Sequence, residues 1–98
     1  KPKIKNIKVV GKIVNIGEKI GIETRFGPAI LTPAVLRDET GSIRLNLWRG
    51  QADMVKKGDR IMLMNAFVRT FKGSMELNIG RDGKIIVLGR KSGRQEGI

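Results

Sequence analysis

The chain has 98 residues and a formal charge of +11, from 20 Lys and Arg against 9 Asp and Glu. That length suits one domain with a modest core, and we see no apolar run long enough to span a bilayer and no secretory leader. Because Cys and His are both absent, disulfides, thiolate metal sites and the most common general base are excluded. We therefore expect no enzyme, no cofactor and no membrane, and the charge fits either a polyanionic partner or a solvated basic surface.

The N-terminal third predicts two strands around a glycine-rich connection. The first strand covers residues 7–16, where β-branched residues dominate. Gly11 permits a bend, so this strand could serve two sides of a curved sheet. Residues 17–28 form a loop or hairpin. The second strand covers residues 29–37, in which Pro33 requires an edge or bulged position because proline lacks a backbone donor.

A tight turn at residues 38–41 joins the second strand to a third at residues 42–48. Acidic and hydroxyl side chains suit this turn, and Gly41 supplies a permissive backbone. The third strand alternates strictly. One face is aliphatic and carries Ile43, Leu45 and Leu47. The opposite face carries Arg44, Asn46 and Trp48. The only Trp of the chain therefore lies on the polar face of a strand, which core packing does not explain.

The C-terminal half predicts a short helix and two or three further strands. Residues 49–57 suit at most two helical turns before Gly58. The fourth strand covers residues 60–70. A loop at residues 71–74 leads into the fifth strand at residues 74–79. A turn at residues 80–83 follows, and residues 84–88 form a further strand or an extension of the fifth. In the fifth strand we expect Met75, Leu77 and Ile79 to face the core.

These elements predict an all-β fold. Five short strands, a bend in the first and a short helix between the third and fourth describe a closed Greek-key barrel of the OB type. In that fold, strands 2 and 3 and loops 1–2 and 4–5 form the usual binding face. We expect the domain to cover residues 1–89 and residues 90–98 to form a flexible basic tail. Since the chain starts with Lys1, we also expect it to be a piece of a longer protein.

The aromatic residues suggest what the domain binds. Ile, Val, Leu and Met can fill the core, which leaves three rings near one another and interleaved with cations. Unpaired bases stack on such rings while Arg and Lys meet the phosphates, with little sequence preference. The sequence thus predicts that single-stranded DNA stacks on Trp48, Phe67 and Phe71. Further contacts are predicted from Arg25, Arg37, Arg44, Asn46, Arg49, Arg69 and Lys72.

Several alternatives stay open at this level. Phe67 could belong to the core, Phe71 could plug the barrel end, and Phe26 fits either role. An RNA-binding OB domain of a translation or tRNA-related protein is a second possibility, because stacking does not distinguish ribose from deoxyribose. A protein-interaction module is a third, since the same rings could form a binding hot spot.

Six short motifs within about residues 5–88 occur together in one known family. They are Asp38-Glu39-Thr40-Gly41, Ile43-Arg44-Leu45-Asn46-Leu47-Trp48, Lys57-Gly58-Asp59, Asn65-Ala66-Phe67, Phe71-Lys72-Gly73 and Glu76-Leu77-Asn78. Together they resemble the archaeal single-stranded DNA-binding proteins of the one-OB type and, more loosely, the OB domains of replication protein A.

This resemblance implies both site residues and a biological role. It implies that Trp48, Phe67 and Phe71 stack on successive bases and that Ile22 packs against a base. Asn78 stands where some relatives have Tyr, so a fourth stack is not expected there. The family further implies a cytoplasmic, nucleoid-associated role in replication, repair and recombination. It also implies a longer tail for repair or replication partners, which this chain does not include.

Overall fold

The computed structural model of the protein describes residues 4–90, which form six strands and one short 3-10 helix. The elements are β1 (Ile4–Ile16), β2 (Ile20–Thr24), β3 (Gly27–Asp38), β4 (Gly41–Trp48), η1 (Arg49–Met54), β5 (Arg60–Phe71) and β6 (Ser74–Gly89). The predicted helix between the third and fourth barrel strands is present, but it is shorter than residues 49–57. No helix in this part of the chain is long and apolar enough to cross a membrane.

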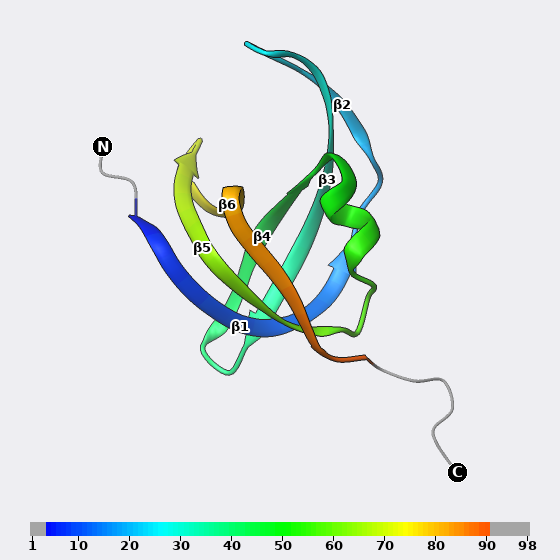
Figure 1. Ribbon diagram of the computed structural model, residues 1–98. Helices are drawn as coiled ribbons and strands as arrows, with labels where there is room; N and C mark the ends of the chain where they lie inside the picture. The colour runs from blue at the N-terminus through cyan, green and yellow to red at the C-terminus, as the bar shows by residue number, and fades with distance from the viewer. Residues whose placement is uncertain (1–3, 91–98) are drawn as a thin grey trace.

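Five of the strands close into a ring. The pairing order is β1-β5-β6-β4-β3, and β3 pairs back onto β1, which confirms the predicted closed all-β sheet. β2 lies at the outer edge and pairs with β3. The two strands form a hairpin that rises beyond the ring, and η1 lies beside its base (Figure 1). The segment predicted as loop or hairpin is therefore a hairpin.

Gly11 allows β1 to serve both neighbours. β1 pairs with β5 as far as Lys12 opposite Arg60, and with β3 from Lys12 opposite Arg37 onward. A Cβ atom at Gly11 would lie 2.9 Å from the backbone oxygen of Arg37. Because that is closer than real Cβ contacts, only glycine allows β1 to approach β3 and close the ring. β1 thus serves two sides of the sheet, as predicted.

Pro33 sits where β3 changes partner. β3 pairs with β2 up to Leu31 and with β1 from Ala34. The N–H of Gly17 donates to the Pro33 carbonyl at 2.7 Å. Since the nitrogen and oxygen of one strand residue point to the same side, the missing donor of Pro33 faces this change of partner. The position thus meets the predicted requirement.

Two expectations about β6 are wrong. The predicted turn at residues 80–83 does not end the strand but lies within β6 as a wide bulge. β5 pairs with β6 up to Ile79 and again from Lys84, and this register gives residues 80–83 no partner. Gly83 serves close packing here, since a Cβ would collide with the Ile79 side chain. Met75 does not face the core. It is 54% exposed, because it lies at the hairpin end of the strand.

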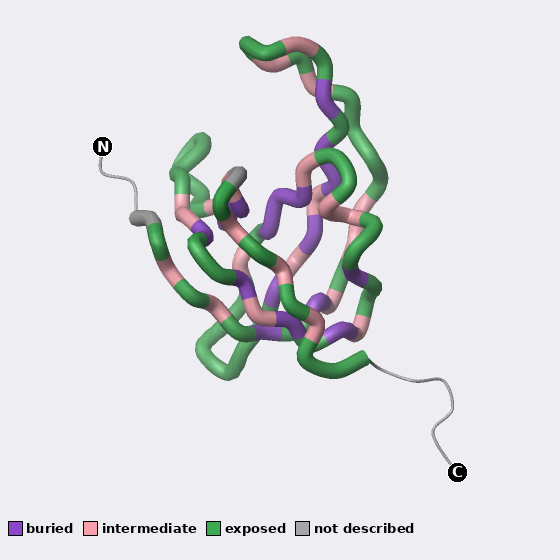
Figure 2. Tube along the Cα trace, viewed as in Figure 1, coloured by how far each residue is buried: buried purple, intermediate pink, exposed green. Residues whose placement is uncertain are grey.

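The core that the structure describes is built from Ile, Val and Leu, as predicted, and from Ala, while Met, which was also expected, is absent from it. Its buried residues are distributed along the strands of the ring (Figure 2). Burying each larger side chain contributes roughly 1.5–3 kcal/mol to folding. The buried cluster comprises Ile13, Ala34, Leu36, Leu45, Leu47, Val55, Ile61, Leu63, Ala66, Leu77 and Ile79. All four aromatic residues lie outside this cluster.

Candidate nucleic-acid interface

Strand register places the three predicted stacking residues on one outward face. Asn46 of β4 pairs with Asn78 of β6, which in turn pairs with Phe67 of β5. Paired residues share a side of the sheet, and alternate residues along a strand share it too. Trp48 therefore lies on the same side as Asn46, and Phe71 on the same side as Phe67. We call this side, defined by Trp48, Phe67 and Phe71, the ring face.

The ring face continues across both flanks of β6. Arg44 of β4 and Arg69 of β5 both lie opposite Glu76, so both predicted cations share the face. Beyond β4, on the β3 and β2 side of the sheet, Ile22 of β2 pairs with Ala29 of β3. Ala29 is on the same side of β3 as the residue that pairs with Trp48. Ile22 is half-buried there, so an aliphatic side chain borders the rings as the family resemblance implied.

Two of the rings carry a cation at close range. The Arg69 guanidinium carbon lies 5.8 Å from the centroid of the Phe67 ring, and Lys72 Nζ lies 5.5 Å from the centroid of the Phe71 ring. Phe67 is half-buried and Phe71 is exposed, at 57%. Gly80 lies beside the Phe67 ring, since a Cβ there would be at ordinary contact distance, 3.4 Å, from its Cε1. A flat surface beside a positive charge suits a base followed by its phosphate.

A hydrogen-bond network holds Trp48 and Arg44 in place. Trp48 Nε1 and Asn46 Nδ2 both donate to Asn78 Oδ1, each at 3.2 Å. Asn46 Nδ2 also donates to Glu76 Oε1 at 2.8 Å, and Arg44 Nε donates to Asn46 Oδ1 at 2.9 Å. Arg44 and Glu76 complete the network as an ion pair of 4.0 Å. Asn46, predicted as a direct contact, is buried under this network, so it supports the surface and does not form it.

Gln51 fixes the backbone behind Trp48. The Trp48 N–H donates to Gln51 Oε1 at 2.8 Å, and Gln51 Nε2 donates to the Ile79 carbonyl at 3.2 Å. Gln51 thereby ties η1 to β6. Sequence reasoning missed the supporting roles of Gln51, Glu76 and Asn78. The one available signal was the alternation of Glu76 and Asn78 with core residues along β6, which indicates that both face outward.

The remaining predicted contacts lie around the ring face. Arg37 shares its side of the sheet but pairs with Ser42, six residues along β4 from Trp48 or about 20 Å of strand. Its Nε donates to Ser42 Oγ at 3.3 Å. Arg49 is exposed and follows Trp48 directly, with a φ of 55°. Arg25 is exposed at the tip of the β2–β3 hairpin. The structure thus brings Arg44 and Arg69 close to the rings and sets Arg25 and Arg37 at the two ends.

The acidic groups near this surface do not form a metal site. Among the described residues, no group of three or more Asp, Glu, His or Cys is placed to hold a metal ion. The carboxylate of Asp38 instead stabilises the β3–β4 turn. The Thr40 hydroxyl donates to Asp38 Oδ1 at 2.6 Å and the Thr40 N–H at 2.8 Å. These bonds, the hydroxyl first, lower the pKa of Asp38 below its ordinary value.

Comparison with known proteins identifies the family. A family described as single-stranded DNA-binding protein Ssb-like, OB fold, matches residues 1–87. The chain belongs to this Ssb-like family. It is 33% identical over 85 residues to the single-stranded DNA-binding protein Ssb of Saccharolobus solfataricus, an alignment that covers 87% of this chain and 57% of that protein. The resemblance to archaeal one-OB proteins is therefore confirmed.

Two further relatives agree with the fold. Replication factor A of Methanothermobacter thermautotrophicus is 35% identical over 81 residues, which cover 82% of this chain and 10% of that protein. The solution structure of an OB domain from Thermoplasma acidophilum superposes with a TM-score of 0.73 at 25% identity, covering 87% of this chain and 76% of that one. This Ssb-like chain thus spans little more than half of the Ssb protein and a tenth of replication factor A.

Proposed function

We propose that this Ssb-like domain binds single-stranded DNA with little sequence preference by stacking bases on Trp48, Phe67 and Phe71. One feature carries the proposal: register places all three rings on one outward face while the aliphatic core is complete without them. Each stacked base contributes roughly 1–3 kcal/mol. Three rings therefore supply about 3–9 kcal/mol gross, from which the cost of ordering the strand is subtracted.

The cations supply the second part of the binding energy. Arg44, Arg69 and Lys72 lie on or beside the ring face, where they can meet phosphates between stacked bases. Each neutralised phosphate releases counterions, so affinity falls as salt is added. For single strands the logarithm of the binding constant falls by about 0.7 per contacted phosphate for each tenfold rise in salt concentration. Additional contacts in the proposal come from the residues that flank the rings, namely Ile22, Arg25, Arg37 and Arg49.

The biological role follows from the class of ligand. Duplex DNA hides its base faces, so a stacking surface selects unpaired strands. The relatives named Ssb and replication factor A support a role in protecting such strands during replication, and we extend it to repair and recombination. We further propose a non-catalytic protein of the cytoplasm, associated with the nucleoid. In this proposal, partner proteins bind to a tail that this chain does not include. The basic tail predicted at the end of this chain is a separate segment, and its residues 91–98 lie outside the described residues.

Trp48 provides the test, because it is the only Trp of the chain. Titration with oligo-dT should change its fluorescence, and the affinity should fall steeply between low and high salt. Phe67→Ala and Phe71→Ala should each weaken binding by about 5- to 150-fold, which corresponds to 1–3 kcal/mol. Leu88→Ala, which removes a similarly exposed apolar side chain near the end of β6, should change nothing.

Three outcomes would contradict the proposal in different ways. Absence of any oligo-dT binding refutes it outright. Tighter binding of a matched RNA oligomer would replace DNA with RNA as the ligand. Binding of a protein partner to the same rings, with little salt dependence, would identify an apolar docking face instead.

A further inference from the structure

Phe26 is a large apolar side chain that the site described above does not use. It is 86% exposed, more than any other large hydrophobic residue among those described. It lies at the tip of the β2–β3 hairpin, where Arg25 and Phe26 form the two-residue connection between Thr24 and Gly27. An aromatic ring held almost entirely in solvent at a hairpin tip contributes nothing to the core. Single exposed apolar side chains are common on protein surfaces, so a role for Phe26 depends on its position and on the cation beside it.

The turn does not require a ring at this position. The Phe26 N–H donates to Thr24 Oγ1 at 3.1 Å, and that hydroxyl donates to the Gly27 carbonyl at 2.6 Å. Gly27 takes the positive φ, 106°, that the hairpin needs. Thr24 and Gly27 therefore satisfy the turn chemistry between them, and polar residues would serve at the tip. The ring is held out on an ordered turn.

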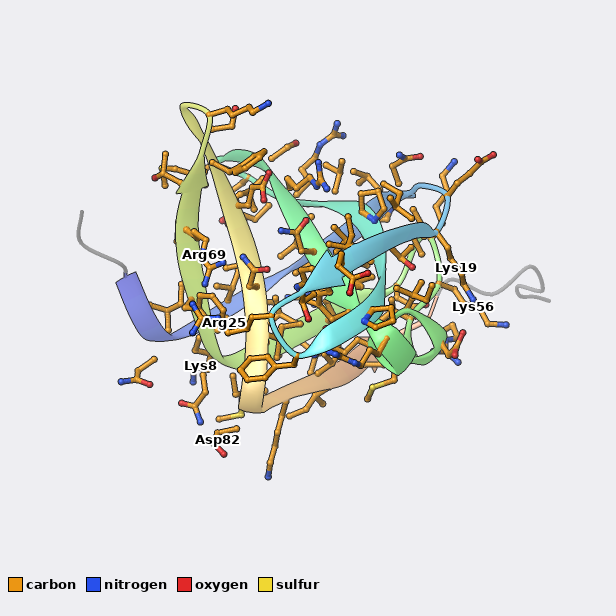
Figure 3. All side chains as sticks on the ribbon, turned by 90° about the horizontal axis from the view of Figure 1, so that it is seen from above. Lys8, Lys19, Arg25, Lys56, Arg69 and Asp82 are labelled. Atoms are coloured by element: carbon orange, nitrogen blue, oxygen red, sulfur yellow. The ribbon has the colours of Figure 1, made fainter. Side chains whose placement is uncertain are left out.

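The hairpin carries Phe26 beyond the Trp48 end of the ring face. Leu31 pairs with Trp48, and Phe26 lies five residues further along the hairpin, or about 16 Å of strand. Figure 1 shows the tip arching from the end of the barrel toward the side of the β5–β6 hairpin. Seen from above in Figure 3, the labelled Arg25 lies on the same side of the molecule as Arg69, away from Lys19 and Lys56.

The two hairpins end in the same combination of groups. At the β5–β6 tip, Lys72 Nζ lies 5.5 Å from the centroid of the Phe71 ring. At the β2–β3 tip, the guanidinium carbon of Arg25 lies 6.0 Å from the centroid of the Phe26 ring. Both tips lie at the same end of the barrel (Figure 1). A nucleic-acid strand that crosses the ring face from one hairpin to the other therefore meets a ring with a neighbouring cation at each hairpin tip.

We propose that Phe26 is a fourth stacking residue, which lengthens the site beyond Trp48 and takes a base that the three other rings do not reach. Arg25 meets the adjacent phosphate. This inference rests on the proposed single-strand binding, and it adds a dependence on ligand length. A short oligonucleotide occupies the central rings alone, whereas a longer one also reaches the hairpin tip.

The test compares two ligand lengths. Oligo-dT of about 5 and about 12 nucleotides falls within the range of sites known for OB folds, and Trp48 fluorescence reports binding in every variant. Phe26→Ala should weaken binding of the longer oligomer by about 5- to 150-fold and leave the shorter one unchanged. Phe26→Leu keeps the apolar volume without a flat face and should resemble Phe26→Ala, whereas Phe26→Tyr should bind like the unaltered protein. Leu88→Ala is the control for loss of an exposed apolar side chain.

The outcomes separate this inference from the function it rests on. If the unaltered protein binds both oligomers and Phe26→Ala binds the longer one equally well, the fourth stack is refuted and the three-ring site stands. If Phe26→Ala weakens both lengths equally, Phe26 does not extend the site and the inference is likewise overturned. If the unaltered protein binds neither oligomer, the proposed function itself fails. Unchanged thermal melting of Phe26→Ala confirms that the comparison is between folded proteins.

Discussion

Replacing Asn78 by leucine should disturb both the fold and the ligand site, although Asn78 does not touch the proposed ligand. Asn78 is 5% exposed, and its Oδ1 accepts hydrogen bonds from the Trp48 indole and the Asn46 amide, each at 3.2 Å. Leucine has a similar volume and no acceptor. The indole Nε1–H of Trp48 then loses its partner, while Asn46 keeps its bond to Glu76. The bond from Asn78 Nδ2 to the Glu76 carbonyl is also lost, but it is long, at 3.4 Å. At roughly 0.5–1.5 kcal/mol for each of the two bonds to Oδ1, we expect Asn78→Leu to cost about 1–3 kcal/mol of stability.

The same substitution should affect binding through the position of Trp48. Ordering one freed side chain again on binding costs about 0.5–1.5 kcal/mol, so affinity for oligo-dT should fall about 2- to 12-fold. Thermal melting should shift down by roughly 5–20 °C for a domain of this size. Trp48 fluorescence measures the affinity, and circular dichroism measures the melting.

Asn15→Leu provides the matched control, because Asn15 is an exposed strand residue. It should change neither the melting temperature nor the affinity. If Asn78→Leu melts and binds like Asn15→Leu, the network does not position Trp48 and our account of the ring face is wrong.

Three further predictions concern the fold. Thr32→Val should raise stability by about 1 kcal/mol in a denaturant titration, because Thr32 Oγ1 is buried without a hydrogen-bond partner among the described residues. Arg90→Ala should lower stability by about 1–3 kcal/mol in the same assay. It removes the two hydrogen bonds that Arg90 Nε and Nη2 donate to the Asp59 carboxylate, at 3.1 Å each, and the partial exposure of the arginine side chain limits the loss. Thr40→Val should raise the pKa of Asp38 toward its ordinary value, as measured by NMR titration of the carboxyl group.

Each of these has a distinct contradicting result. A destabilised Thr32→Val would show that the hydroxyl has a partner in solution. Arg60→Ala, which removes an exposed cation, is the control for Arg90→Ala. If the two variants are equally stable, the ion pair between Arg90 and Asp59 contributes nothing to stability. For Asp38 the sign is fixed by linkage: a lowered pKa stabilises the fold above the pKa of the unfolded state, and this is lost as the pH falls through the folded pKa. Thr40→Val should therefore show less acid-dependent loss of stability, and an unchanged Asp38 pKa would contradict the role of the hydroxyl.

Local patterns were enough to predict much of the fold. The alternation from Ser42 to Trp48 and the turn after Asp38 depend on neighbours within a few residues, and the structure has both. The closed five-stranded sheet followed from the number and order of such segments. The aliphatic core also followed from composition, because the chain holds enough Ile, Val and Leu to fill the ring without an aromatic residue.

The errors occurred where distant strands decide the outcome. Glycines at positions 80 and 83 are typical of a turn, yet β5 pairs with β6 up to Ile79 and again from Lys84, so the strand continues across a wide bulge. Met75 has the parity of a core residue, but the barrel does not extend as far as the hairpin end where it lies. In both cases pairing and closure outweighed the local preference.

What the sequence decided is which side chains alternate along each strand, because backbone geometry alone sets that period. What only the tertiary structure decided is which strands meet and in what register. The parallel pairing of β4 with β6 brings Asn78 under Trp48, although thirty positions separate them. The outer pairing of β2 carries Phe26 beyond the Trp48 end of the ring face. Such contacts arise from closing the ring around a shared core, and no pattern within one segment encodes the partner that another segment will supply.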